Sequence, residues 1–357
     1  MGIDEEIKEI EEEIAETPYN KATEQHIGRL KAKLSKLKEK RAQQESGSGG
    51  GGGYAVEKTG DATVVLVGFP SVGKSTLLNQ LTNAESETGD YGFTTIEVVP
   101  GMLKHRGAEI QILDVPGLIE GASGGRGKGR EVLSVVRSAD LLLFLVDVFE
   151  PQQYTKLRDE LYSNGIRMDT TPPEVIINRR DRGSIDVRKV GDVSLSDEAI
   201  KETCNQHGIV NASVVIREDI TLDELNDAIL DNRVYVDTMV AVNKVDLADE
   251  DTINWTREEL SEQGVDEAIG ISAEKGLGLD VLKERMFESL DLIRVYLKPQ
   301  GGEADMDDPL VVPAGSTVKD VARKIHRDFQ QRFRYAKVWG ESAKHDEQQV
   351  GKDHELA

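Results

Sequence analysis

The stretch "GFPSVGKST", Gly68 to Thr76, constrains the fold of this chain more than any other feature, because it joins the apolar run "ATVVLV" to the helix-forming "LLNQL". Two glycines, a lysine and two hydroxyls at this spacing match a phosphate-binding loop, in which backbone N–H groups and a helix N-terminus hold an anion. An ordinary glycine-containing turn is the alternative. Since the motif, the preceding strand and the following helix all agree, we expect a bound triphosphate here.

Individual residues of this loop have distinct chemical roles. Lys74 can reach the β and γ phosphates, and we expect it to contribute to catalysis. The Ser75 hydroxyl can bind magnesium. The predicted phosphate-binding residues are Gly68, Phe69, Pro70, Ser71, Val72, Gly73, Lys74, Ser75 and Thr76.

Length and composition set the broad class. With 357 residues the chain is long enough for roughly two or three domains. It has no apolar stretch of membrane-spanning length, its N-terminus does not resemble a signal peptide, and its single cysteine, Cys204, excludes an internal disulfide. The C-terminal "DHEL" differs in order from an ER-retention signal. We expect a soluble, cytoplasmic protein with no membrane partner.

The chain is strongly acidic. Its 44 basic and 66 acidic residues give a net charge of −22, and the acids are spread through every segment. High salt would screen the self-repulsion of such a surface, so we interpret the charge as adaptation to a high-salt cytoplasm, as in a halophilic archaeon. An ordinary acidic protein is the alternative.

Residues 1–44 are predicted to form a helical hairpin, because isoleucines and leucines recur at heptad spacing on both sides of "TPYN". The first half is rich in glutamate, and the second half is rich in lysine and arginine. Either the two helices pair these charges, or the second helix presents a basic face to RNA. The glycine-rich residues 45–60 are predicted to be a flexible tether.

Beyond the tether, near-continuous apolar strands alternate with helices, which indicates a parallel sheet covered on both faces. The strand-like runs are "ATVVLVGF", "EIQILDV", "LLLFLVDVF", "TMVAVNKVD" and "AIGISA". This α/β nucleotide domain is predicted to span residues 61–164 and 234–290. Residues 165–233 interrupt the alternation as an inserted α+β subdomain, and residues 291–357 are predicted to form a small C-terminal domain.

The segment "NKVD", Asn243 to Asp246, ends one of the buried strands. The Asp246 carboxylate can accept hydrogen bonds from guanine N1–H and the 2-amino group, a donor pair that adenine lacks. We expect Lys244 to cover the base and Asn243 to brace the loop. The segment predicted to close over the base is Ser272, Ala273 and Glu274 of "SAEKG".

Two further motifs indicate magnesium and a γ-phosphate. "DVPG" follows a strand, so Asp114 can support magnesium and the Gly117 N–H can sense the γ-phosphate. "YGFTT" contains Thr94 and Thr95 in a segment expected to be mobile, and we assign the magnesium-binding hydroxyl to Thr95. The predicted magnesium ligands are Ser75, Thr95 and Asp114, and the predicted catalytic residues are Lys74, Thr95 and Gly117.

These motifs, in this order, resemble those of the Obg superfamily of translational GTPases, and specifically the developmentally regulated GTP-binding (DRG) family. The likeness covers nearly the whole chain, including "KATEQHIGRLKAKLSKL", "LDVPGLIEGASGGRGKGREVLSVVRSAD" and "VYLKPQG". It implies a P-loop GTPase domain that binds GTP/GDP and magnesium, an insert like the second domain of ribosomal protein S5, and a C-terminal TGS domain with a β-grasp. It also implies association with the ribosome or RNA, through the basic hairpin helix and the TGS domain, and leaves room for a regulatory protein.

The sequence differs from related GTPases in three places. Related potassium-dependent GTPases carry asparagine where this chain has Ser71, which leaves potassium activation open. A TGS domain continues into one more strand beyond "GKDHELA", so we expect an unpaired strand edge. Leu118 stands where many small GTPases have a water-orienting glutamine, so we expect slow intrinsic hydrolysis.

We therefore expect a GTP-hydrolysing switch with mobile segments at residues 94–95 and 117–130. A binding module in which GTP only stabilises a shape is one alternative. An ATP-dependent phosphotransferase is another.

Overall fold

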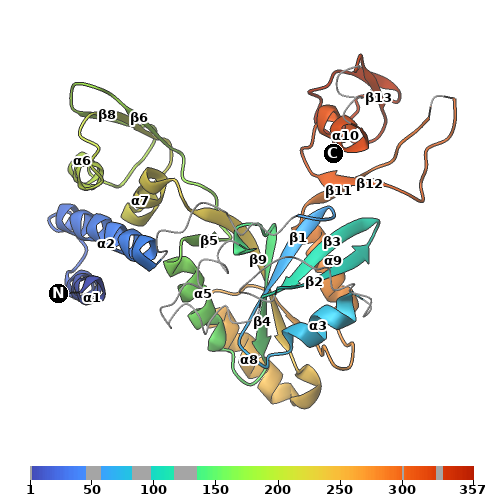
Figure 1. Cartoon of the computed structure of the whole chain (residues 1–357), viewed down its shortest axis with the longest axis horizontal. Coiled ribbons are helices and arrows are strands. Elements are labelled where there is room, and N and C mark those ends of the chain that lie inside the picture. The colour runs from blue at the N-terminus through green and yellow to red at the C-terminus, as the bar shows by residue number, and fades with distance from the viewer. Residues whose placement is uncertain (1, 46–57, 83–97, 116–134, 300, 327–332) are drawn as a thin grey trace. The chain divides into compact units, whose positions relative to one another are not determined.

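The computed structural model describes residues 2–45, 58–82, 98–115, 135–299, 301–326 and 333–357 (Figure 1). The chain separates into two compact units. Of the described residues, the first unit contains 2–45 and 161–236, and the second contains the others. None of the helices in the described part of the chain is long and apolar enough to cross a membrane.

The second unit is built on a largely parallel sheet with strand order β10-β9-β4-β1-β3-β2. Among the described strands of this sheet, β2 alone is antiparallel to its neighbour, and Pro100 and Gly101 interrupt its pattern, so the sequence did not predict it. The predicted parallel α/β sheet is confirmed. Its strands are β1 (Ala62–Val67), β2 (Val99–His105), β3 (Ala108–Asp114), β4 (Leu141–Asp147), β9 (Val234–Asn243) and β10 (Ala268–Gly270).

Helices cover both faces of this sheet (Figure 1). Successive residues of a strand point to opposite faces. Leu143 of β4 shares a buried cluster with Leu77 of α3 and Leu282 of α9, whereas the next residue, Phe144, packs edge-on against Tyr154 of α5 with ring centroids 5.3 Å apart. The helices are α3 (Lys74–Leu81), α5 (Gln153–Ser163), α8 (Glu250–Glu262) and α9 (Leu279–Ser289).

The C-terminal part of the second unit contains two antiparallel strand pairs, β11 with β12 and β13 with β14. Helix α10 begins with a capping box, in which the side chains of Thr317 and Asp320 each accept a hydrogen bond from the other's N–H group. The unpaired strand edge that we expected in the C-terminal domain stays a prediction. The elements are β11 (Leu292–Val295), β12 (Leu310–Pro313), α10 (Val318–Ile325), β13 (Ala336–Val338) and β14 (Gln348–Val350).

The first unit begins with the predicted helical hairpin, α1 (Ile3–Glu16) and α2 (Glu24–Glu45). Ile7 and Ile10 of α1 and Ile27 of α2, all on the heptad pattern, are buried. Among the described residues, three lysine or arginine side chains of α2 form ion pairs with acidic residues of α1, as one of the two interpretations of the hairpin charges requires. These pairs are Glu6–Lys33 at 2.7 Å, Glu11–Lys38 at 2.8 Å and Asp4–Arg41 at 3.4 Å.

The inserted segment forms a three-stranded sheet of order β6-β8-β7, in which β8 is antiparallel to β6 and parallel to β7. The residues of α6 and α7 that face this sheet share one buried core with it, which gives the predicted α+β architecture. Strand β5 (Ile166–Met168) pairs with the first residues of β9. The other elements are β6 (Val175–Arg179), β7 (Ile185–Lys189), α6 (Asp197–Gln206), β8 (Ala212–Ile216) and α7 (Leu222–Leu230).

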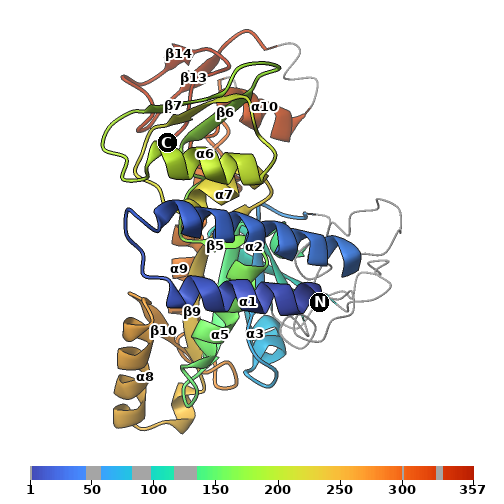
Figure 2. The same cartoon turned by 90° about the vertical axis from the view of Figure 1, so that its left-hand side faces the viewer.

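Helix α2 lies against α6 and α7 of the insert (Figure 2), a packing that the sequence did not predict. Ile27 belongs to the core of the insert. Gly28 permits the close approach, since a Cβ there would lie 3.3 Å from a methyl group of Leu222. Lys31 pairs with Asp223 at 2.5 Å. The hairpin therefore helps to bury the insert's apolar surface.

Candidate functional site

The predicted phosphate-binding residues, Gly68 to Thr76, lie in the loop from β1 to α3 and in the first turn of α3. Strand β1 is buried along its whole length, which fixes the start of the loop. Gly73 is the N-cap of α3 and provides no side-chain acceptor for the first N–H groups of the helix. These groups are therefore available to an anion.

Both glycines of the motif are required by close packing. Gly73 has φ of 102°, and a Cβ there would lie 2.4 Å from Nδ2 of Asn243. At Gly68 a Cβ would lie 2.7 Å from the carbonyl oxygen of Leu145. Because neither contact can be relieved without moving the loop or its neighbour, no larger side chain fits at either position.

The Lys74 ammonium lies inside the loop. It donates to the carbonyl oxygens of Gly68 at 2.9 Å and Phe69 at 3.1 Å. Burial lowers the pKa of Lys74, and the nearby Asp114 carboxylate partly offsets this effect. A phosphate group in the loop would favour the charged form of the lysine.

Ser75 and Asp114 form a pair that fits magnesium. The Ser75 hydroxyl donates to Oδ2 of Asp114 at 2.6 Å. The second carboxylate oxygen, Oδ1, is buried and has no hydrogen-bond partner in the described part of the chain. Leaving such an oxygen unsatisfied is costly, and a hydrated divalent cation would satisfy it. Ser75 would bind the metal directly, and Asp114 would hold it through a water molecule.

Asn243 connects the phosphate loop to the base-binding segment. Its Nδ2 donates to the carbonyl oxygen of Val72 at 2.8 Å, and its Oδ1 accepts from the N–H of Ala273 at 2.9 Å. The side chain is 3% exposed, so both bonds are shielded from water. Asn243 thus links the two segments by hydrogen bonds, which supports the bracing role that the sequence predicted.

Lys244 and Asp246 follow at the carboxyl end of β9. Lys244 has φ of 67°, and its ammonium pairs with Oδ2 of Asp147 at 2.7 Å. Sequence reasoning missed Asp147, although a carboxylate at the end of the apolar run "LLLFLVD" is a signal for it. The Asp246 carboxylate has no hydrogen-bond partner within the described ranges, which leaves it available to a base.

The segment Ser272–Glu274 is shaped by its own backbone. The Ser272 N–H donates to the carbonyl of Leu277 at 3.0 Å, and its hydroxyl accepts from the N–H of Lys275 at 3.1 Å. Ser272 and Ala273 are buried, whereas Glu274 is exposed. The side chain of Glu274 is therefore a weaker candidate for contact with the base than the backbone of Ser272 and Ala273.

Thr95 and Gly117 lie outside the described residues. The magnesium-binding role of Thr95 and the γ-phosphate contact of Gly117 stay predictions. Seven of the predicted positions outside the phosphate loop are described, and the second unit brings them to the carboxyl ends of β3 and β9 and to the segment after β10. These are Asp114, Asn243, Lys244, Asp246, Ser272, Ala273 and Glu274.

Comparison with known protein families agrees with this architecture. The model described as 50S ribosome-binding GTPase matches residues 63–179, and the model of the C-terminal region of that domain matches residues 182–292. The TGS domain model matches residues 293–357. The chain is therefore a P-loop GTPase-domain protein with a C-terminal TGS domain.

Full-length relatives define the family more closely. A GTP-binding protein of Methanocaldococcus jannaschii is 56% identical, covering 100% of this chain and 91% of that protein. A GTP-binding protein of Halobacterium salinarum is 54% identical, covering 100% and 97%. Developmentally-regulated G-protein 3 of Arabidopsis thaliana is 43% identical, covering 98% and 95%. The chain belongs to the DRG family of GTP-binding proteins.

Proposed function

We propose that this chain is a GTP-hydrolysing molecular switch that associates with the ribosome or RNA. The observation that carries the nucleotide part is the Asn243 side chain, which bonds to Val72 of the phosphate loop and to Ala273 of the base segment. A single nucleotide can therefore contact both segments at once. The unpaired Asp246 carboxylate favours guanine over adenine as its base.

The chemical step uses few protein groups. Magnesium, when bound, neutralises charge on the β and γ phosphates. The Lys74 ammonium stabilises negative charge on the transferred phosphoryl group. Leu118 offers no hydrogen bond to water, so hydrolysis is slow in isolation. A potassium ion near Ser71 would neutralise the developing charge, or a partner that contacts residues 119–130 would supply the missing stabilisation.

Two segments of the sequence are proposed to report the nucleotide state. Residues 94–95 and 117–130 lie outside the described residues, and their roles rest on the threonine and glycine motifs alone. Loss of the γ-phosphate removes the contacts that order such segments in GTPases.

Association with the ribosome or RNA is supported by the description of the matching family model and by two cations of α2. Most of the basic residues of this helix form an ion pair or a hydrogen bond within the first unit. Those with a partner are Lys31, Lys33, Lys36, Lys38 and Arg41. Arg29 and Lys40 are exposed and have no partner within the described ranges. We propose that these two cations and the TGS domain contact the partner.

Binding to purified ribosomes in different nucleotide states tests the switch. We expect the highest affinity with a non-hydrolysable GTP analogue and a lower affinity with GDP. Equal affinities in all states would instead favour a nucleotide-stabilised binding module in which hydrolysis is incidental. Competition in which ATP displaces GTP would favour an ATP-dependent phosphotransferase.

Charge reversal on α2 tests the proposed contact. Changing Arg29 and Lys40 together to glutamate should weaken ribosome or RNA binding and flatten its salt dependence, because phosphate contacts release counterions. Lys33→Glu is the matched control, since its ammonium already pairs with Glu6. An unchanged salt slope in the double variant would leave α2 with a purely structural role.

A further inference from the structure

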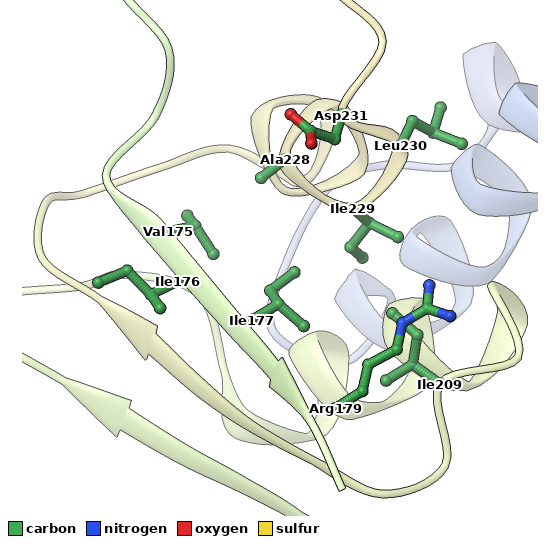
Figure 3. Close-up of a pocket in the computed structure, with 9 residues that line it drawn as sticks. All are labelled: Val175, Ile176, Ile177, Arg179, Ile209, Ala228, Ile229, Leu230 and Asp231. Carbon is green, nitrogen blue, oxygen red and sulfur yellow. The ribbon is translucent and has the colours of Figure 1, made fainter.

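A groove in the first unit lies between strand β6 and helix α7 (Figure 3). Its lining is mainly aliphatic, with Val175 and Ile177 from β6, Ile209, and Ile229 from α7. Its volume is about 560 Å³, within the ~300–1,000 Å³ typical of ligand sites.

The ends of the groove carry opposite charges. Arg179 ends β6, and Asp231 follows the last residue of α7. Figure 3 shows the two side chains on opposite sides of the groove. Both are exposed, and neither has an ion-pair partner in the part of the chain that the structure describes. The groove therefore offers a free cation at one end and a free anion at the other.

The free edge of β6 lies beside the groove at Ile177 and Arg179, whereas the N–H of Val175 donates to the carbonyl of Pro173. Strand β6 is at the edge of the sheet and pairs only with β8 among the described strands. The N–H of Arg180 donates to Asn211, and the carbonyl of Glu174 accepts from Arg217, so residues at even positions turn their backbone groups toward β8. Residues alternate in an antiparallel ladder, so the odd positions turn theirs away. Ile177 and Arg179 therefore present backbone donors and acceptors at the free edge.

We propose that this groove binds an extended peptide segment of a partner protein, which adds a strand to β6. Main-chain hydrogen bonds to the edge of β6 provide affinity, and side chains at alternate positions of the peptide enter the aliphatic groove. An acidic residue of the peptide lies at Arg179, and a basic residue lies at Asp231.

The chemistry of the groove favours a peptide over RNA. The free edge supplies both donors and acceptors, as a strand requires, whereas a phosphate needs donors alone. The lining residues include no aromatic side chain on which a base could stack. An extended peptide with aliphatic side chains at alternate positions matches the aliphatic lining of the groove better than RNA does. This inference does not depend on the nucleotide bound to the second unit.

Binding of two defined peptides to the full chain provides the test. The probes are acetyl-Glu-Thr-Val-Thr-Val-Thr-Lys-amide, whose charged residues and valines share one face of the strand, and the same peptide with its two charged residues exchanged, each followed by fluorescence anisotropy. One peptide should bind about fivefold more tightly than the other, because only one places its acidic residue at Arg179 and its basic residue at Asp231. Arg179→Glu should remove this preference. Arg182→Glu, an exposed arginine that does not line the groove, is the matched control and should preserve it.

Backbone pairing is tested without changing the protein. Amide hydrogen exchange at Ile177 and Arg179 should slow when the preferred peptide is bound. N-methylation of the peptide at alternate residues should abolish binding in one register and spare it in the other, since only one set of N–H groups faces β6.

Three results would overturn the proposal. The first is no binding of either peptide. The second is binding that leaves exchange at Ile177 and Arg179 unchanged or responds equally to Arg179→Glu and Arg182→Glu. The third is an RNA oligonucleotide that protects these amides when the peptides do not, which would assign the groove to nucleic acid.

Discussion

Asn243 uses both ends of its amide to hold the phosphate loop and the base segment together. Replacing it with alanine leaves the Val72 carbonyl and the Ala273 N–H without their partner. Each buried unsatisfied group costs about 1–3 kcal/mol, so Asn243→Ala should lower the free energy of unfolding and weaken GDP binding about tenfold or more. Denaturant unfolding and GDP titration measure the two effects. Asn79→Ala, at an exposed position of α3, is the control. Unchanged GDP affinity in Asn243→Ala would contradict the bracing role.

The base preference depends on Asp246. An amide at this position presents a donor where guanine N1–H needs an acceptor, so Asp246→Asn should weaken GTP binding by about 10- to 100-fold. Xanthine nucleotides should lose less affinity or gain some, because a carbonyl oxygen replaces the guanine 2-amino group and can accept a hydrogen bond from the new amide. Competition binding with GTP and XTP measures this, with Asp251→Asn on the exposed surface of α8 as control. Unaltered base preference would remove Asp246 from the site.

Much of this site could be predicted because each motif stands at a strand end. Asp114 and Asn243 end buried strands of a parallel sheet, and carboxyl ends of such strands meet at one edge. The pairing of Lys244 with Asp147 could not be predicted, because it depends on the register between β4 and β9. Sequence alone also does not distinguish the buried Ala273 from the exposed Glu274, since loop backbone geometry decides this.

At the scale of elements, one carboxylate joins three segments of the first unit. Arg167 of β5 and Arg233, just before β9, both bind Asp227 of α7, with Nε–O distances of 2.5 and 2.6 Å. The Asp227 side chain is only 4% exposed. The Tyr162 ring centroid lies 3.8 Å from the Arg167 guanidinium carbon. The cluster therefore ties β5 and the start of β9 to the insert.

Removing the charge of Asp227 should leave two largely buried arginines without a compensating carboxylate. We expect Asp227→Asn to lower the free energy of unfolding by about 3–5 kcal/mol. Asp223→Asn, on the same helix, breaks a more exposed pair with Lys31 and should cost about 1 kcal/mol or less. Urea unfolding followed by circular dichroism compares the two. Similar losses of unfolding free energy in both variants would show that the Asp227 cluster stabilises the fold no more than an exposed ion pair does.

The elements themselves were mostly predictable, and their packing was not. Apolar runs and heptads gave the strands of the main sheet and the hairpin, because burial imposes a period on the sequence. Strand β2 escaped prediction because Pro100 and Gly101 disturb its alternation. The packing of α2 on the insert depends on a few local features, such as Gly28 against Leu222, which no periodic pattern contains.

At the scale of the whole molecule, net charge governs the response to salt. A charge of −22 destabilises the compact state through self-repulsion, and ions screen it. The melting temperature should therefore rise from dilute buffer to molar KCl. A melting temperature that does not change over this range would identify an ordinary acidic protein rather than a salt-adapted one.

Single-turnover hydrolysis of GTP by the full chain tests the central claim most directly. The reaction is measured with magnesium at matched ionic strength in KCl and in NaCl, with and without ribosomes. We predict that hydrolysis is slow in isolation, because Leu118 cannot orient water, and faster with potassium, with ribosomes or with both. ATP should not be hydrolysed in place of GTP. Fast hydrolysis in every condition, or no GTP hydrolysis in any, would contradict the proposal of a slow switch that a cation or partner completes.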